Sequence, residues 1–365
     1  MSLRCGIIGL PNVGKSTLFN ALSGAAAAAA NYPFCTIEPN RGIVPVPDDR
    51  LDRLAEVCNS PEAIPTTIEF VDIAGLVAGA SKGEGLGNTF LGHIRQVSAL
   101  IHVVRCFDDE RVTHVEGDVD PRRDIEIIET ELLLTDLETV ERSSQKAAKQ
   151  AKGGDKIAQA QGAFCERLAV HLGKGEAARL FTPQNEEESA WMRALFLLTS
   201  SPVLFAANVN EADLPHGNRH VATIREIAAT RAARVVVVCA DFEAQLIDLS
   251  AQDRMEFLRL AGLARPGLER LIRAAYDLLG LVTFFTHGPK ESRAWTIKQG
   301  TNVREAAGKI HSDFARGFIR AETITIDELI RRGSETAARE AGVMRAEGKE
   351  YVVRDGDVIL FRFNV

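Results

Sequence analysis

The stretch Gly9–Thr17 (GLPNVGKST) matches the pattern G-x-x-x-x-G-K-[ST] at every defined position. It follows Leu3–Ile8, a short and mainly apolar run that predicts a buried strand. It precedes Lys15–Ser23, whose apolar spacing predicts a helix that Gly24 closes. A glycine-rich turn between a strand and a helix is the setting in which this pattern binds nucleotide phosphates. The sequence therefore predicts an α/β domain with a phosphate-binding loop.

Each defined residue of the loop has a physical task. Gly9 and Gly14 let the backbone turn tightly, so that successive N–H groups face the phosphates. Lys15 supplies a cation to the β- and γ-phosphates, and Ser16 supplies a hydroxyl to Mg²⁺. The residues expected to contact the nucleotide here are Asn12, Val13, Gly14, Lys15, Ser16 and Thr17.

A second motif, D-x-x-G, occupies Asp72–Gly75 at the end of the predicted strand Thr67–Ile73. Parallel sheets place ligand groups at the carboxyl ends of their strands, so Asp72 is expected to hold Mg²⁺, through water. The amide of Gly75 is expected to sense the γ-phosphate, and the glycine-rich stretch Ser81–Asn88 to move on nucleotide exchange. Thr36, between the two motifs, is a candidate for the second hydroxyl ligand of Mg²⁺.

The residues that read the base are expected after a later strand, Val203–Asn208. That strand leads into Asn208-Val209-Asn210-Glu211, where a guanine reader has N-K-x-D. Glu211 replaces the aspartate that accepts from guanine, and Val209 replaces the lysine that lies over the base. A site that loses matched hydrogen bonds loses discrimination, so this sequence favours ATP over GTP. The alternative is a GTPase with a variant base clamp.

Further strands are predicted at Ala99–Val104 and Val235–Cys239, with helical patterns between most strands, which indicates a largely parallel sheet. The alternation is interrupted by three- and four-residue apolar steps that predict an inserted helical hairpin. Strand patterns at Leu281–Thr286, Arg293–Ile297, Glu350–Val353 and Val358–Phe363 around a helix at Val303–His311 indicate an α+β module. The expected domains are 1–122 with 201–279 (nucleotide binding), 123–200 (helical insertion) and 280–365 (C-terminal module).

Composition excludes several classes of protein. The 365 residues carry a net charge of −7, which argues against a general nucleic-acid coat protein. The six cysteines are scattered, without the spacing of a zinc site, and indicate a reducing compartment. The chain has neither a leader pattern nor a run long enough to span a membrane, so the expected location is the cytoplasm, with no membrane partner.

Four segments together resemble the YchF-type, Obg-like ATPases: GLPNVGKST, NYPFCTIEPN, DIAGLVAGASKGEGLGN and NVNE. The segments RAWTIKQG, KIHSDFARGFIRAE and EGKEYVVRDGDVILFRFNV resemble the TGS module of the same family. The resemblance spans nearly the whole chain. It implies a P-loop G-domain, a coiled-coil insertion and a C-terminal β-grasp domain. It also implies Mg²⁺-dependent ATP hydrolysis and association with the ribosome or its large subunit.

The resemblance leaves the catalytic group open. Ras-like GTPases often place a water-orienting glutamine after D-x-x-G, whereas this chain has Leu76. His114 is the candidate for orienting water, since histidine changes protonation near neutral pH; the alternative is a structural histidine. In related GTPases an asparagine at the position of Asn12 helps to bind K⁺, so Asn12 is a candidate K⁺ ligand.

Basic residues indicate where nucleic acid would bind. The predicted hairpin tip carries Lys146, Lys149, Lys152 and Lys156, which are candidates for salt-sensitive contacts with RNA phosphates. Arg316, Arg320, Arg331 and Arg332 are the corresponding candidates in the C-terminal module. A solvated polar loop is the alternative for the tip. A rival for the whole chain is an RNA- or ribosome-binding adaptor in which nucleotide only stabilises the fold.

Overall fold

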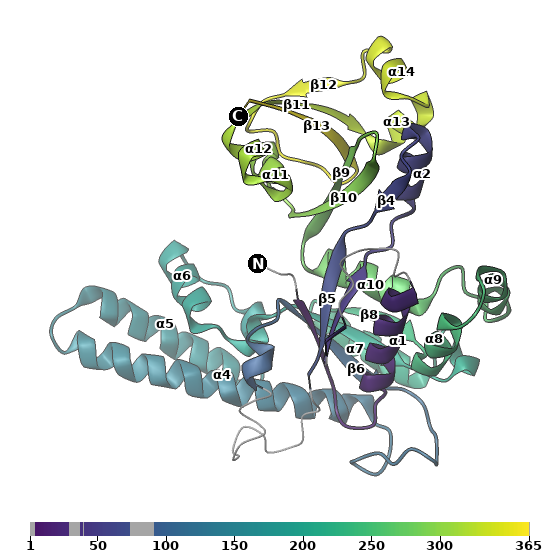
Figure 1. The fold of residues 1–365 in the computed structure, drawn as a ribbon. Helices are drawn as coiled ribbons and strands as arrows, with labels where there is room; N and C mark the ends of the chain where they lie inside the picture. Colours follow the sequence, from purple (N-terminus) through teal and green to yellow (C-terminus); the bar gives the residue numbers. More distant parts are fainter. Residues whose placement is uncertain (1–3, 29–36, 39, 74–90, 365) are drawn as a thin grey trace. The chain divides into compact units, whose positions relative to one another are not determined.

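The computed structural model describes residues 4–28, 37–38, 40–73 and 91–364 (Figure 1). The chain divides into two compact units. The first contains residues 1–28, 36–42 and 69–275, and the second contains residues 29–35, 43–68 and 276–365. No helix of the described part of the chain is both long enough and apolar enough to cross a membrane.

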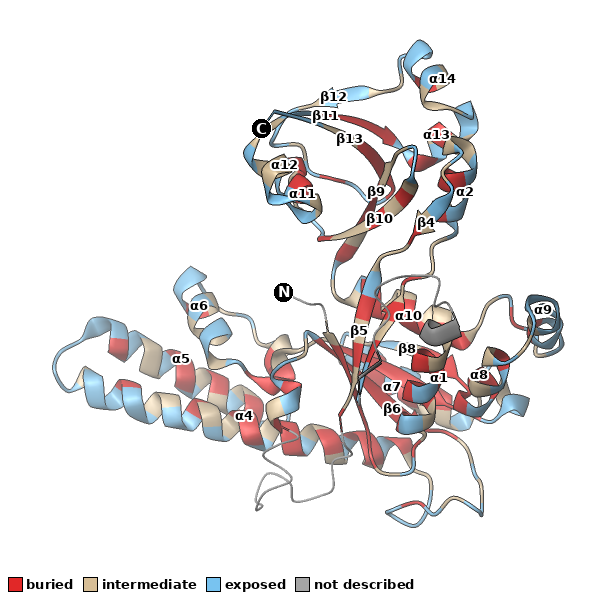
Figure 2. Ribbon diagram, viewed as in Figure 1, coloured by how far each residue is buried: buried red, intermediate tan, exposed pale blue. Residues whose placement is uncertain are grey.

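The first unit is built on a seven-stranded sheet with the order β2-β3-β5-β1-β6-β7-β8. Its strands are β1 (Arg4–Ile8), β2 (Ile37–Glu38), β3 (Arg41–Pro45), β5 (Thr67–Asp72), β6 (Ala99–Arg105), β7 (Val203–Asn208) and β8 (Arg234–Val238). The five strands from β5 to β8 pair in parallel, which confirms the predicted sheet. Every residue of β6 and β7 is buried, as parallel strands covered on both faces require (Figure 2).

Helices α1 (Lys15–Ala28) and α7 (Arg219–Thr230) pack on strands of this sheet, and α8 (Ala240–Ile247) packs against α1. The chain then forms α9 (Ala251–Leu260) and α10 (Gly267–Leu278). The expectation that Gly24 ends the first helix was wrong, because α1 continues to Ala28. A Cβ at Gly24 would lie 2.8 Å from Cδ1 of Ile247 in α8. Gly24 therefore allows two helices to pack closely, and its position in the sequence resembled a helix end.

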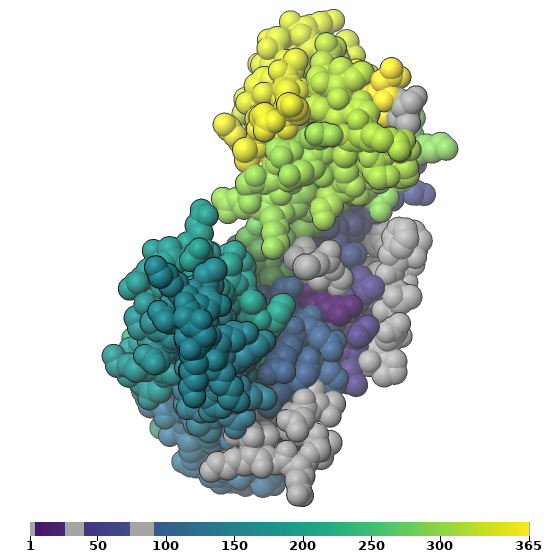
Figure 3. Space-filling model, turned by 90° about the vertical axis from the view of Figure 1, so that its left-hand side faces the viewer, coloured from purple at the N-terminus to yellow at the C-terminus, as the bar shows by residue number. Residues whose placement is uncertain are grey.

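The predicted helical hairpin is present as α4 (Pro121–Ala151) and α5 (Lys156–Gly173). Asp120 caps the start of α4, followed by proline at the first helical position, and Asp155 caps the start of α5. The two helices bury one apolar seam that includes Val140, Phe164 and Leu168. Figure 3 looks toward the end of this arm, drawn in teal. The arm belongs to the same compact unit as the sheet.

A buried carboxylate of α4 binds the segment that leads into the sheet. Asp136 of α4 is 1% exposed. It accepts hydrogen bonds from the backbone N–H groups of Leu198 (2.7 Å) and Thr199 (2.8 Å) and from the Thr199 hydroxyl (2.6 Å). These partners form η3 (Leu198–Ser200), directly before β7. Between α5 and η3 the chain forms η2 (Ala178–Leu180) and α6 (Glu186–Leu195).

The second unit contains a six-stranded sheet with the order β12-β11-β13-β9-β10-β4. Its strands are β4 (Glu62–Ile64), β9 (Leu281–His287), β10 (Glu291–Lys298), β11 (Phe318–Thr325), β12 (Arg345–Glu347) and β13 (Asp357–Phe363). Its helices are α2 (Asp49–Cys58), α11 (Val303–Ile310), α12 (Ser312–Arg316), α13 (Ile326–Arg332) and α14 (Glu335–Glu340). The predicted hairpin and the helix after it are confirmed as β9, β10 and α11.

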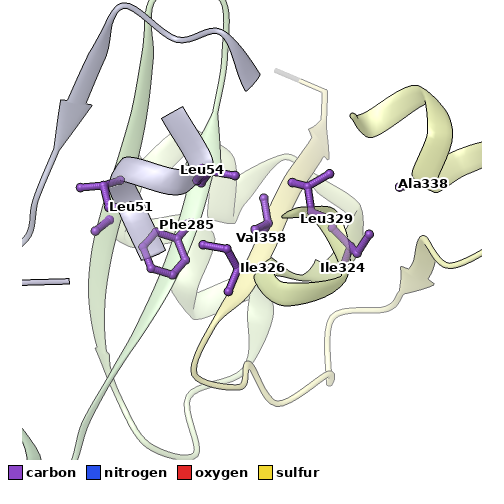
Figure 4. Close-up of a cluster of buried hydrophobic side chains, with 9 residues drawn as sticks. Leu51, Leu54, Phe285, Ile324, Ile326, Leu329, Ala338 and Val358 are labelled. Atoms are coloured by element: carbon purple, nitrogen blue, oxygen red, sulfur yellow. The ribbon is translucent and has the colours of Figure 1, made fainter. Parts of the chain in front are cut away.

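Residues 43–68 belong to this second unit. Leu51 and Leu54 of α2 are buried with Phe285 of β9 and Val358 of β13 (Figure 4). Strand β4 pairs in parallel with β10. The predicted boundary at residue 280 leaves this segment out, because nothing in its local pattern shows which sheet it will cover.

Two details of the C-terminal module differ from the prediction. Glu350–Val353 does not form a strand; Val352 makes only an isolated bridge with Asn302. The strand that pairs with β13 over its length is instead β11, which the sequence analysis did not predict. In β11 the first three residues are partly or fully exposed and the next four are all buried. The strand therefore lacks the alternation of buried and exposed residues that marks a half-buried strand.

We expect Asp136→Ala to lower the free energy of unfolding of the first unit by about 3 kcal/mol, since it leaves buried donors without an acceptor. In a Trp295→Phe background, urea unfolding can be followed through Trp191, which packs on Phe164 of the arm. Glu138→Ala, at an exposed position of the same helix, is the matched control and should change stability by under about 0.5 kcal/mol. Equal effects of the two substitutions would contradict the assignment.

Candidate nucleotide-binding site

The phosphate-binding loop has the backbone that its glycines predict. It joins β1 to α1, and β1 lies between β5 and β6 in the sheet. A Cβ at Gly9 would lie 2.5 Å from the carbonyl oxygen of Val103, so only glycine allows the loop to start this close to β6. Gly14 has φ = 94° and Asn12 has φ = 61°, both in the left-handed region. These conformations and the close contact at Gly9 shape the turn of the loop.

A buried carboxamide holds this loop in place from the other side. Asn208, at the end of β7, donates from Nδ2 to the carbonyl of Val13 (3.0 Å). Its Oδ1 accepts from the N–H of Ala240 (3.0 Å), the first residue of α8. A Cβ at Gly14 would lie 2.2 Å from Asn208 Nδ2, which makes glycine necessary there as well. The residue predicted as a base reader therefore braces the loop.

Lys15 and Asp72 form the charged part of the site. Lys15 is 8% exposed and donates from Nζ to the carbonyl of Leu10 (2.6 Å). Burial lowers the pKa of Lys15 to about 8, and the charge of Asp72 acts in the opposite direction. Burial raises the pKa of Asp72, against the charge of Lys15 and a hydrogen bond from Ser16. The lysine is a cation held in a site of low polarity, where a phosphate group would compensate its cost of burial.

The residues present fit a magnesium ion. Oδ1 of Asp72 is buried and makes no hydrogen bond to any described residue. The exposed Ser16 lies beside it, bonded to the same carboxylate. Carboxylate and hydroxyl oxygens are ligands that Mg²⁺ accepts next to nucleotide phosphates. Within the described ranges, no three His, Cys, Asp or Glu side chains converge on a metal site. Among the described residues, Ser16 and Asp72 would hold a magnesium ion at this loop.

The segment after β7 carries the two residues predicted to face the base. Val209 is buried, and its N–H bonds to the carbonyl of Val238 (2.9 Å). Glu211 is exposed and starts η4 (Glu211–Asp213). Glu211 is therefore free to reach a ligand beside α8. Its role in choosing the base stays a prediction.

The structure places His114 in a buried hydrogen-bonded pair. Its Nε2 lies 2.9 Å from Oδ2 of Asp124 in the first turn of α4, and its Nδ1 accepts from the N–H of Glu116 (3.1 Å). Since Nδ1 accepts, Nε2 carries the proton that is donated to Asp124. Burial raises the pKa of Asp124, against the influence of His114. Both ring nitrogens are occupied, so orienting a water requires this pair to open.

The sequence analysis missed the residue that shapes the loop before His114. Arg105, 2% exposed at the end of β6, donates to three carbonyl oxygens: Phe107 (3.0 Å), Val112 (2.8 Å) and Asp109 (3.2 Å). The loop is thus curled around one guanidinium. It brings the carbonyl of Thr113 within 3.1 Å of Asn12 Nδ2. The sequence did contain a signal for this role, because Arg105 directly follows a run of apolar strand residues.

Other predicted site residues lie outside the described part of the chain. These are Thr36, Gly75, Leu76 and the stretch Ser81–Asn88. Among those described, the structure brings together Asn12–Thr17, Asp72, Asn208 and Val209 around the loop.

Comparisons with known proteins agree with this architecture. Residues 4–146 match a family model described as "50S ribosome-binding GTPase". Residues 281–364 match the C-terminal YchF GTPase model, described as "Protein of unknown function (DUF933)". The chain is 54% identical to the "Ribosome-binding ATPase YchF" of Escherichia coli O157:H7 over 365 residues, covering 100% of both chains.

The chain belongs to the YchF family. It is also 54% identical to the protein of the same name from Bacillus subtilis over 369 residues, again covering 100% of both. A solved structure, titled "Structure of the Schizosaccharomyces pombe YchF GTPase", has a TM-score of 0.88 at 35% identity, covering 99% of this chain and 98% of that one. The relatives thus carry both ATPase and GTPase in their names.

The pKa of Lys15 makes a prediction about pH. Only the ammonium form attracts phosphate, and in the free protein that form is lost above pH 8. A bound phosphate stabilises the ammonium form and so raises the pKa of Lys15. Above pH 8 the protein must therefore take up a proton when the nucleotide binds, and the affinity for the nucleotide falls as the pH rises. We expect the ADP affinity to drop on the order of tenfold between pH 7.5 and 9.5.

Isothermal titration calorimetry in buffers of different ionisation enthalpy would measure both the affinity and the proton uptake. Lys15→Met removes the titrating group, so its weak residual binding should not change over this range. A wild-type affinity that stays constant to pH 9.5 would contradict the lowered pKa.

Proposed function

We propose that this chain is a Mg²⁺-dependent ATPase that acts as a ribosome-associated molecular switch. The observation that carries the proposal is the phosphate loop with Lys15 beside it and an Asp72 oxygen that has no hydrogen-bond partner among the described residues. Relatives identical at more than half of their positions over the full chain are named ribosome-binding ATPases.

The chemistry follows from these groups. The loop amides and Lys15 bind the β- and γ-phosphates and stabilise negative charge as the terminal phosphoryl group leaves. Ser16 and Asp72 would hold Mg²⁺, with Thr36 as a further ligand; the ion supplies charge neutralisation at the phosphates. The Gly75 amide would report the γ-phosphate. Asn208 keeps the loop amides in position, and so contributes by preorganisation.

ATP is favoured over GTP by the segment after β7. Glu211 is one methylene longer than the aspartate of a guanine reader, and Val209 offers an apolar side chain without a cation. Adenine lacks the 2-amino donor, so a weakened guanine clamp removes the main bias against it. A GTPase with a variant clamp is the alternative, and one structural relative is titled a GTPase.

Ribosome contact is assigned to the arm and the C-terminal module. Lys146, Lys149, Lys152 and Lys156 are all exposed on or beside the turn between α4 and α5. A long arm can present them to phosphates in a salt-sensitive and sequence-independent way. The arginines of the module are engaged differently: Arg316 pairs with Asp313, Arg320 with Glu322, and Arg331 and Arg332 with Glu328. The lysines at the tip are therefore the stronger candidates for binding RNA.

We expect phosphate release from ATP to exceed release from GTP at least about tenfold in kcat/KM, and ribosomes to accelerate it. The assay compares both nucleotides with Mg²⁺, with and without ribosomes, at two salt concentrations. Lys15→Ala provides the background of contaminating activity. Release no higher than this background would indicate the adaptor, and GTP binding ten times tighter than ATP would indicate the GTPase.

The catalytic role of His114 makes a separate prediction. If its imidazole leaves Asp124 to orient water, His114→Ala should lower kcat by about a hundredfold. The affinity for ADP should stay within about twofold, since the ring is not a phosphate ligand. His216→Ala, at an exposed position, is the matched control. Normal turnover in His114→Ala would leave the histidine with a structural role only.

For K⁺, the candidate ligand atom is Oδ1 of Asn12, because Nδ2 donates to Thr113. A role for K⁺ stays a prediction, which the same assay tests when Na⁺ replaces K⁺.

A further inference from the structure

A groove with a volume of about 470 Å³ lies in the first unit, beside α6 (Figure 1). Residues 94–98, which lead into β6, form one wall, and one face of α6 with the residues after it forms the other. The apolar part of the lining includes Ile94, Val97, Met192, Phe196, Leu197 and Pro202. The volume lies in the range of about 300–1,000 Å³ that ligand-binding clefts have.

The composition of this groove is typical of a protein–protein contact. Its lining contains Met192, Phe196 and two arginines, Arg95 and Arg193, and none of its described residues is a lysine, an aspartate or a glutamate. Aromatic residues, methionine and arginine are enriched in protein interfaces, whereas lysine and the acidic residues are depleted. The chain as a whole has 50 acidic and 43 basic residues, so this lining is positive where the average surface is not.

Both guanidinium groups are available to a partner. Arg95 and Arg193 are exposed, and neither side chain makes a hydrogen bond or an ion pair with a described residue. Burial raises the pKa of Asp136, and the charge of Arg95 is among the influences that lower it, but this carboxylate is 1% exposed and already accepts three hydrogen bonds. Glu186 and Glu187, exposed in the first turn of α6, do not line the groove.

Phe196 places an exposed aromatic ring at this groove. It follows α6 with φ = 48° and ψ = 48°, the left-handed conformation that only glycine adopts without a steric cost. Phe196 is 73% exposed, so packing within the described chain does little to compensate for that cost. A phenylalanine in a strained and exposed position is explained when a partner buries its ring.

We propose that this groove binds an extended peptide segment of a partner protein, in which apolar side chains lie between acidic ones. The apolar side chains pack on Val97, Met192 and Phe196, and the carboxylates pair with Arg95 and Arg193. An aromatic ring and arginines are the residues that most often dominate the binding energy of such contacts. Charge complementarity thus selects an acidic partner, and the apolar wall selects a protein.

An RNA strand is the less suitable occupant. Bases stack on aromatic rings, and the described lining has one ring, Phe196, among aliphatic side chains and prolines. Two cations are also few for a strand that carries a phosphate at every nucleotide.

The experiment uses the full chain saturated with Mg²⁺ and ADP, so that the phosphate loop is occupied. Fluorescein-labelled peptides carry each pair drawn from leucine, isoleucine, phenylalanine, methionine and tryptophan, with two glutamates on either side. One matched set has glutamine in place of glutamate, and a second has alanine in place of the apolar pair. Fluorescence anisotropy measures binding at low and at high salt, with oligouridine as the RNA probe.

We expect at least one acidic–apolar peptide to bind at least about tenfold more tightly than its glutamine and alanine counterparts, and less tightly at high salt. The double substitution Arg95→Gln with Arg193→Gln should weaken this peptide at least about tenfold, to the level of its glutamine counterpart. Arg225→Gln, at an exposed position of α7, is the matched control and should leave the affinity unchanged.

Phe196→Gly separates binding from folding. Glycine accepts the left-handed conformation, so the thermal midpoint should not fall, whereas the peptide affinity should fall at least about tenfold. Ala232, which is exposed with φ = 50°, offers the matched control. Ala232→Gly makes the same change of backbone preference and should leave peptide binding unchanged.

The proposal would be overturned if no acidic–apolar peptide bound more tightly than its counterparts, or if peptide binding survived Phe196→Gly. Tighter binding of oligouridine that Phe196→Gly abolishes would overturn it in favour of RNA. The comparison of the peptide sets needs only the wild-type chain, so it decides the matter even if a variant does not fold. The outcome is independent of the ATPase assay, because none of residues 9–17 lines the groove.

Discussion

The structure of the nucleotide site depends on a close approach of backbone to backbone. The phosphate loop can present its N–H groups only if it leaves β1 in contact with β6 and turns back beneath β7. Gly9 and Gly14 make the approach sterically possible, since a Cβ at either would overlap its neighbour. The carboxamide of Asn208 then fixes the loop by bonding to Val13 and to the start of α8. The first of these hydrogen bonds joins residues 195 positions apart in the sequence.

The same region holds two charged groups, Lys15 and Asp72, that influence each other's pKa. Burial disfavours the charge on Lys15 and on Asp72 alike, and each partly offsets the cost for the other. Asn12 and Gly14 have left-handed backbone conformations, and Oδ1 of Asp72 has no hydrogen-bond partner among the described residues. A bound phosphate and a divalent cation are the partners that would compensate the charges of Lys15 and Asp72.

The arm is joined to the nucleotide unit at several points of the same kind. Asp136 binds the turn before β7, and Asp124 binds His114 in the loop that follows β6. Arg105 orders that loop, which contacts Asn12 of the phosphate loop through Thr113. A chain of polar contacts, buried at His114–Asp124 and exposed at Asn12–Thr113, therefore runs from α4 to the phosphate loop. The same part of α4 carries Glu129, which two arginines, Arg179 and Arg231, approach.

The sequence by itself determined the parallel α/β sheet, the phosphate loop, the helical hairpin and the strands β9, β10 and β13. In each case the signal is local: glycines at fixed spacing, apolar runs or helical periodicity carry their own structure. Only the tertiary structure decided that Gly24 packs against Ile247, that β4 joins the C-terminal sheet with α2 packed in its core, and that Asn208 braces the loop. The same holds for Arg105 and for the pairing of His114 with Asp124. All of these features depend on contacts between segments that are distant in the sequence. The local sequence around a residue does not show which distant residue it will contact in the folded protein.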